Sequence, residues 1–169
     1  MTLFEVRVSV PVAASPADVY AVVSDLPRSG EWSSECRGGT WIHGTPATVG
    51  AVFRGVNHRT ADVVEWAPVV RGEWTTEAEV VVAEPGRRFS WSMRNSKGHK
   101  QDSVWTYEIE PGVLTHHFRM GEPTEGIEGI TADMDDADRR RFFSEWGKKL
   151  EGDMAATLDR VKAVIEEVN

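Results

Sequence analysis

The fold follows mainly from the C-terminal stretch DMDDADRRRFFSEWGKKLEGDMAATLDRVKAVIEEV, residues 133–168. Its large apolar residues recur at intervals of three and four, which is the stripe of an amphipathic helix. The stripe consists of Phe142, Phe143, Trp146, Leu150, Met154, Leu158, Val161, Ile165 and Val168. Asp133, Asp135 and Asp136 precede it and suit the positive end of a helix dipole. We therefore predict one long helix from about residue 135 to the end of the chain.

Ahead of this helix, the pattern predicts strands joined by tight turns. The expected strands lie near residues 38–44, 49–58, 71–84, 87–95, 102–110 and 113–120. The sequence Glu-Pro-Gly, at 84–86 and again at 110–112, is typical of a tight turn, because proline presets φ and glycine accepts a positive φ. Turns this short join antiparallel neighbours, since a parallel pair needs a long crossover.

The N-terminal part adds one more strand and two short helices. Residues 3–13 alternate between apolar and polar side chains, which is the period of a half-buried strand. The sequence Ser-Pro-Ala-Asp at 15–18 is typical of a helix start, and a second helical turn is predicted at 31–36. Residues 122–131 are rich in Gly, Pro and Glu and predict a loop.

These elements predict an α+β arrangement. A sheet must bury its apolar face against another element, and the last helix is the only predicted one that is long enough. We therefore expect a seven-stranded curved antiparallel sheet that wraps around the C-terminal helix, with two short helices, and that encloses a pocket. The 169 residues fit a single domain, 1–169.

The composition excludes several classes of function. The chain has 27 Asp and Glu against 19 Lys and Arg, a formal charge of −8, so we expect no nucleic-acid partner. No apolar stretch approaches the ~20 residues that span a bilayer, and the N-terminus lacks the apolar run of a signal peptide. We therefore expect a cytoplasmic protein without membrane insertion. Cys36 is the only cysteine, and no Cys/His spacing suggests a metal, so neither metal nor other cofactor is predicted.

Six short segments of the sequence resemble a known family. They are SPADVY at 15–20, DLPR at 25–28, EWSSEC at 31–36, GAVFRGVN at 50–57, EPGRRFSW at 84–91 and WTYEIEP at 105–111. With the element order, they resemble the START-like (SRPBCC) superfamily, which has the helix-grip fold of the birch pollen allergen family, and within it the polyketide cyclase/dehydrase branch. The resemblance covers essentially the whole chain. Ser34 stands where the branch usually has proline, and residues 59–72 look longer than the usual hairpin.

The resemblance implies a pocket more strongly than a reaction. Members of the superfamily bind hydrophobic ligands, and some cyclise or dehydrate polyketides. We therefore expect binding of a small hydrophobic molecule, polyketide-like, lipid or aromatic, in an internal cavity. The alternative is a polyketide cyclase/aromatase or dehydratase that acts on a ligand folded in the same cavity. A third hypothesis is a regulatory or stress protein whose long helix or 59–72 insertion docks another protein. A homodimer is also possible under each hypothesis.

Strand alternation predicts which side chains face the pocket. The odd positions of 89–93, which are large and apolar, and the odd positions of 105–109 are predicted to face the concave side, as are the even positions of 74–80 and 114–120. The predicted ligand-binding residues are Phe53, Asn57, Trp74, Trp91, Trp105, Tyr107, Phe118, Trp146, Met154 and Leu158. The alternative is a closed core, but seven tryptophans exceed what a core of this size needs, and aromatic walls with a few polar groups are typical of ligand sites.

Three polar or amphipathic residues carry separate predictions. His116 is the candidate catalytic residue, because imidazole titrates near neutrality, although it also fits a core histidine bonded to backbone or a residue that orients the ligand. Its neighbour His117 points to the opposite face, so the two cannot hold one metal ion. Asn57 suits either a ligand carbonyl or the cap of a turn. Trp66 is the predicted tip of the 59–72 segment, over the pocket mouth.

Overall fold

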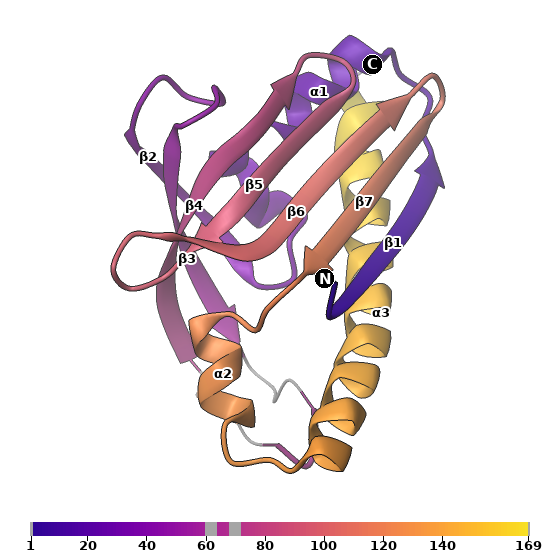
Figure 1. Cartoon of the computed structure of the whole chain (residues 1–169). Coiled ribbons are helices and arrows are strands. Elements are labelled where there is room, and N and C mark those ends of the chain that lie inside the picture. The colour runs from indigo at the N-terminus through magenta and orange to yellow at the C-terminus, as the bar shows by residue number, and fades with distance from the viewer. Residues whose placement is uncertain (1, 60–63, 68–71, 169) are drawn as a thin grey trace.

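The computed structural model describes residues 2–59, 64–67 and 72–168. Within these ranges, seven strands form one antiparallel sheet (Figure 1). They are β1 Phe4–Pro11, β2 Cys36–His43, β3 Val52–Arg59, β4 Gly72–Glu84, β5 Arg88–Arg94, β6 Lys100–Glu110 and β7 Val113–Met120. The strand order is β1-β7-β6-β5-β4-β3-β2, so the first strand of the chain lies beside the last. The predicted strands are therefore present, with ends shifted by a few residues.

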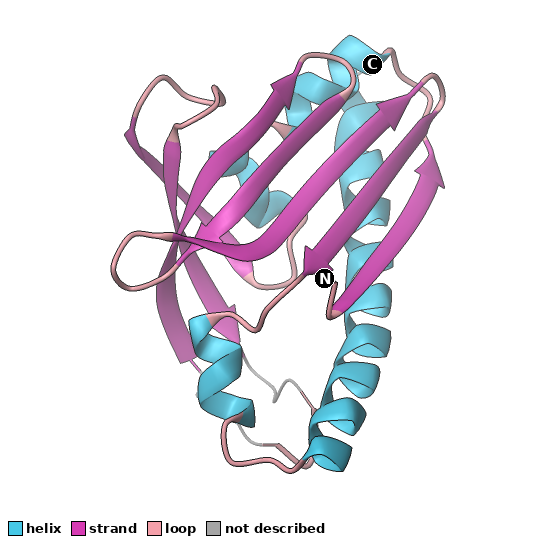
Figure 2. Cartoon of the chain, in the orientation of Figure 1, coloured by secondary structure: helices cyan, strands magenta, loops and turns pink. Residues whose placement is uncertain are grey.

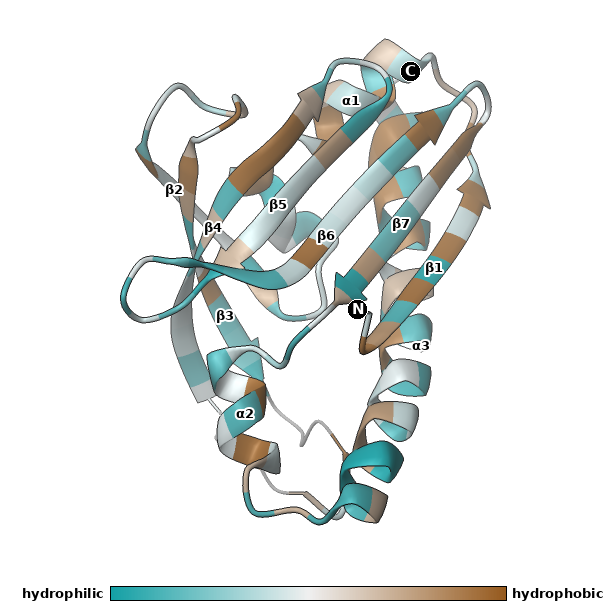
Figure 3. Cartoon of the chain, viewed as in Figure 1, coloured by the Kyte–Doolittle hydropathy of each residue, from teal (hydrophilic) through white to brown (hydrophobic). Residues whose placement is uncertain are grey.

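Local sequence explains the turns and the two faces of the sheet. Gly86 and Gly112, in the two Glu-Pro-Gly turns, have φ values of 74° and 78°, a region that glycine adopts without a steric penalty. A hydrogen bond from Arg87 N to Glu84 O, 2.9 Å long, closes the first turn. Along β1, apolar and polar residues alternate, so that one face turns inward and the other meets solvent (Figure 3).

Helices cover the inner side and one end of the sheet. They are α1 Pro16–Val23, the 3₁₀ helix η1 Leu26–Glu31, α2 Glu125–Thr131 and α3 Asp136–Val168. Ser15 caps α1 as predicted, because its side chain accepts a hydrogen bond from Asp18 N at 3.2 Å. Figure 2 shows α3 running past the sheet along its length, with α2 beyond one end of the strands. Within the described ranges, no helix is both long and apolar enough to cross a membrane.

The second short helix differs from its predicted position. It spans Leu26–Glu31, whereas the sequence predicted a turn at 31–36. Leu26 is buried, with 4% of its surface exposed, and the Ser29 hydroxyl donates to Leu26 O at 2.6 Å, which closes the helical turn earlier. By residue 36 the chain has already entered β2.

The predicted loop at 122–131 is also wrong from residue 125 onward, where the chain forms α2. The carboxylate of Glu125 accepts hydrogen bonds from Ser96 N and Ser96 Oγ, at 2.9 and 2.6 Å. Glu125 N donates to Gln101 Oε1 at 2.7 Å. Ile127 and Thr131 are buried. Contacts with the β5–β6 hairpin therefore hold a helix that is too short to be stable alone.

The core lies between α3 and the inner face of the sheet. On α3, Leu158, Val161 and Ile165 have at most 1% of their surface exposed, and they pack in one cluster with Ile109 and Leu114 of the sheet. Nearer the start of α3, a second cluster joins the helix to β7. Its buried members are Val6, Val64, Ala67, Phe118, Met120, Ile127, Phe142, Phe143 and Met154. The sheet thus wraps around the helix, and the predicted α+β helix-grip fold is confirmed.

Truncation of the α3 stripe should destabilise the whole domain. Leu158→Ala removes a side chain with 1% exposure and leaves a cavity, so we expect the free energy of unfolding to fall by about 2–5 kcal/mol. Urea denaturation followed by circular dichroism measures this change. Asp159→Ala, one position along on the solvent side of the same helix, should change stability by less than about 0.5 kcal/mol. Equal effects of the two substitutions would show that the stripe does not carry the fold.

Candidate functional site

Two rows of aromatic side chains cross the inner face of the sheet. In the first row Trp91 on β5 pairs with Trp105 on β6, which in turn pairs with Phe118 on β7. In the next row Tyr107 on β6 pairs with His116 on β7. The rows face α3, because Tyr107 and Phe118 lie in the two clusters that contain the buried α3 side chains.

The rings in these rows touch one another and reach α3. The ring centroids of Tyr107 and His116 are 4.2 Å apart, and those of Trp105 and Phe118 are 4.3 Å apart. Phe118 contacts Trp146 of α3 at 6.2 Å. Five predicted ligand-binding or catalytic residues therefore belong to one aromatic wall, in which a sixth, Trp91, contacts Tyr107 at 5.8 Å.

Three further predicted residues lie apart from this wall, on β3 and β4. Phe53 belongs to a third cluster with Leu26, Ala51, Val80 and Phe89, against which Trp91 of the wall also packs. Asn57 Nδ2 donates to Thr76 Oγ1 at 2.9 Å, a cross-strand bond rather than the cap of a turn. Trp74 lies beneath the guanidinium of Arg59, whose central carbon is 4.6 Å from the ring. Strand alternation predicted that these residues lie on the inner face. It gives no information on their distance from the aromatic wall across the sheet.

Burial divides the predicted residues into two groups. The buried ones are Phe53, Asn57, Tyr107, His116, Phe118, Met154 and Leu158. Trp74, Trp91, Trp105 and Trp146 are only half-buried. Trp91 and Trp105 lie on β5 and β6, which have strand neighbours on both sides, so their exposure does not come from a sheet edge. Water therefore reaches these two indoles from the inner side of the sheet.

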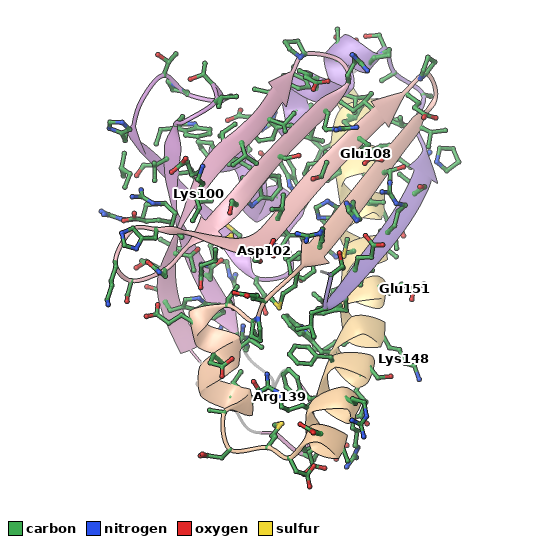
Figure 4. All side chains as sticks on the ribbon, in the orientation of Figure 1. Lys100, Asp102, Glu108, Arg139, Lys148 and Glu151 are labelled. Carbon is green, nitrogen blue, oxygen red and sulfur yellow. The ribbon has the colours of Figure 1, made fainter. Side chains whose placement is uncertain are left out.

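Two hollows in the described surface lie elsewhere. They have volumes of about 440 and 340 Å³ and lie between β1 and the first half of α3. Both are lined by Phe4, Phe143 and Ser144. Their rims mix charges of both signs, including Arg139, Lys148 and Glu151, which Figure 4 shows on this stretch of α3. They do not include the predicted ligand-binding residues.

His116 is held as a neutral imidazole. Its Nδ1 lies 3.2 Å from Thr106 O, and because a carbonyl oxygen only accepts, Nδ1 carries the proton. Burial lowers the pKa of His116 from 6.5 to about 4, and the bond to Thr106 opposes that fall only in part. The ring stacks on Tyr107 at an angle of 14°. His116 therefore has no charge near neutral pH.

The pKa of the Tyr107 phenol is influenced by Trp32, a residue that the sequence analysis did not predict as part of the site. Trp32, with 2% exposure, belongs to the same core cluster as Tyr107, and its indole N–H is the polar group that acts on the pKa of the phenol. Burial raises the pKa of the Tyr107 phenol, and the bond from Trp32 opposes this rise. Trp32 lies just beyond η1, and its own backbone oxygen accepts from Arg160 Nε at 2.7 Å. Trp32 lies in a short irregular segment without sequence periodicity, so no pattern in the sequence predicts that it packs beside Tyr107.

The described part of the 59–72 segment docks on α3. Trp66 donates from Nε1 to the carboxylate of Glu145, and Arg141 lies over its ring with the guanidinium carbon 4.5 Å from the centroid. Val64 and Ala67 are buried in the cluster around Phe142. Trp66 is therefore an anchor on the helix rather than a free tip. Residues 60–63 and 68–71 lie outside the described residues.

Comparison with known proteins assigns the family. The family described as polyketide cyclase / dehydrase and lipid transport matches residues 4–166. A Polyketide_cyc-like protein of Corynebacterium glutamicum, solved by solution NMR, is 29% identical, with a TM-score of 0.59 over 96% of this chain and 91% of that chain. No curated protein matches the chain.

Two more distant structures share the fold alone. The di-domain ARO/CYC BexL, from the BE-7585A biosynthetic pathway, is 18% identical, with a TM-score of 0.63 over 95% of this chain and 49% of that chain. This chain therefore spans about half the length of BexL. A Staphylococcus aureus protein of unknown function is 13% identical, with a TM-score of 0.67 over 98% of this chain and 94% of that chain. Because the family model matches this chain over nearly its whole length, the chain belongs to the polyketide cyclase/dehydrase and lipid transport family.

Proposed function

We propose that the protein binds a small hydrophobic molecule, polyketide-like, lipid or aromatic, between the inner face of the sheet and α3. The observation that carries this proposal is the partial exposure of Trp91 and Trp105, which face inward from central strands. Apolar surface that stays in contact with water costs about 25 cal/mol per Å² relative to burial. A flat apolar ligand that covers these indoles would remove that cost.

The chemistry of the wall supports the same function. The wall is aromatic, and a few polar groups, those of Asn57, Thr76 and His116, stand on the same inner face. Such a combination is typical of small-molecule sites, where apolar contact gives affinity and a few polar groups orient the ligand. The family description, which includes lipid transport, agrees with a carrier of this kind.

The second candidate is a polyketide cyclase/aromatase or dehydratase that acts on a ligand in the same place. The family description and the ARO/CYC neighbour favour it. His116 is the residue that would move protons, but its pKa of about 4 leaves no proton to donate near pH 7. Such a histidine can accept a proton or a hydrogen bond, and general acid catalysis would need another group. Binding therefore ranks first.

Ligand titration tests the proposed function directly. Isothermal titration calorimetry with naphthalene, ANS and fatty acids should detect micromolar binding to the folded protein. Trp105→Leu removes one inward indole and should weaken aromatic ligands by about threefold to tenfold, since an aromatic pair contributes about 0.5–1.5 kcal/mol beyond its buried area. Val104→Ala, the adjacent change on the outer face of β6, should leave affinity unchanged. If no probe binds, the proposed function is wrong.

His116→Gln separates the two candidate functions. In a binding protein this change should alter affinity by about 1 kcal/mol, the usual net contribution of one hydrogen bond. In a cyclase that uses His116 as a base, binding should persist while turnover falls by roughly 10²–10⁴-fold. Parallel measurements of affinity and of cyclised product decide between them. His117→Gln, on the opposite face of β7, is the control and should change neither quantity.

The neutral state of His116 should appear in the pH dependence of stability. Folding lowers the pKa of His116 from 6.5 to about 4, so between these values the unfolded chain binds more protons than the folded one. The free energy of unfolding should therefore increase as the pH rises through this window. Acidification from pH 7 to pH 4 should lower it by about 3 kcal/mol. His116→Gln should lack this contribution in urea denaturation at the two pH values. The same dependence in both proteins would contradict the burial of a neutral imidazole.

A further inference from the structure

We propose that Nε2 of His116 accepts a hydrogen bond from a hydroxyl group of the ligand, which makes the ligand a planar aromatic or enolic molecule with a neutral hydroxyl on its edge. This inference rests on the proposed function, because it concerns the same inner face. It adds a chemical requirement that apolar contact alone does not impose.

The first step is the tautomer of His116. Thr106 O accepts the proton on Nδ1 over 3.2 Å. A neutral imidazole with its proton on Nδ1 has a lone pair on Nε2, which is an acceptor. The backbone of β6 therefore fixes the proton on one side of the ring and leaves the acceptor on the other.

The second step is that this acceptor has no protein partner. Among the described residues, the hydrogen-bond and ring contacts of His116 are with Thr106, Tyr107, Trp105 and Trp91. The only described side-chain N or O atom that is sealed from water and unpartnered is Glu166 Oε2. Nε2 is therefore not sealed, although only 5% of the His116 surface is exposed. The ring is therefore buried apart from this one open acceptor.

The third step concerns the side chains that surround the imidazole ring of His116. Tyr107 stacks on His116 at 4.2 Å and 14°, and Trp105 lies at 5.5 Å and 26°. On the other side, Val8 of β1 is the cross-strand partner of His116. The neighbours cover the faces of the imidazole, so a ligand approaches it at the edge. A flat molecule beside these nearly parallel rings would place a group on its own edge against Nε2.

The fourth step excludes an anionic head group at this point. A carboxylate offers only acceptors, and two acceptors cannot share a hydrogen bond. The described hydrogen-bond and ring contacts of His116 include no Lys or Arg, so none of these contacts would attract an anion. A hydroxyl donor satisfies the lone pair of Nε2, whereas a carboxylate or an ether leaves it without a bond in a mainly apolar setting, which costs affinity.

Three probes of one shape test this requirement: 2-naphthol, 2-methoxynaphthalene and naphthalene-2-carboxylate. Calorimetry on the full chain at pH 7 should show that 2-naphthol binds about threefold to tenfold more tightly than the methyl ether, the net effect of one hydrogen bond. The carboxylate should bind more weakly than either. His116→Phe keeps a stacking ring without the acceptor and should abolish the preference for 2-naphthol. His117→Phe, the matched change on the outer face, should retain it.

A measurement on the unaltered protein guards against a variant that fails to fold. In ¹⁵N-histidine NMR, 2-naphthol should shift the Nε2 resonance of His116, and 2-methoxynaphthalene should leave it nearly unchanged. If the naphthol and its ether bind equally and neither moves this resonance, the hydroxyl requirement is wrong while the proposed function stands. If neither naphthalene nor any of the three substituted probes binds, the proposed function and this inference are both wrong.

Discussion

The structure depends on one constraint: the apolar stripe of α3 has to be covered along most of its 33 residues. Leu158, Val161 and Ile165 are sealed because α1 and strands from both ends of the chain pack in one cluster with them. The pairing of β1 with β7 brings the N-terminal strand next to the last one and extends the cover. A helix that is polar on its other side can be buried on one face without charged groups entering the core.

Large aromatic residues change what this arrangement leaves inside. Aliphatic side chains pack the core where α3 meets α1 and β6, but the middle of the sheet presents indoles and phenyl rings. Rings of this size meet edge to face or offset, as Phe4 and Phe118 do at 5.6 Å and 61°. Trp91 and Trp105 remain partly exposed. The same residues therefore stabilise the sheet and provide a surface for a flat apolar molecule.

Sequence reasoning succeeded wherever a short-range period sets the structure. The alternation along β5, β6 and β7 placed Trp91, Trp105 and His116 on the side that faces α3, and the three-four stripe defined α3. It failed where distant contacts decide. The bond of Glu125 to Ser96 joins residues 29 positions apart and holds α2, and Trp66 reaches Glu145 across 79 positions. No local sequence pattern predicts such pairs. The pattern of residue types also does not predict what fraction of an inward-facing tryptophan remains exposed to solvent.

Adjacent histidines on β7 show how strand geometry alone assigns chemistry. His117 points outward, where its Nε2 lies 2.9 Å from Glu5 Oε2, and this hydrogen bond is the largest cause that lowers the pKa of the Glu5 carboxyl. The outer face around it carries further ion pairs, such as Arg119 with Asp102 at 2.6 Å, which are half-exposed and contribute little stability each. His116 points inward, away from every one of these charges, and is neutral because it is buried. A shift of one residue in the register of β7 would exchange the two environments, so the pairing of β7 with β1 and β6 is what makes His116 an acceptor in the interior instead of a surface residue beside Glu5.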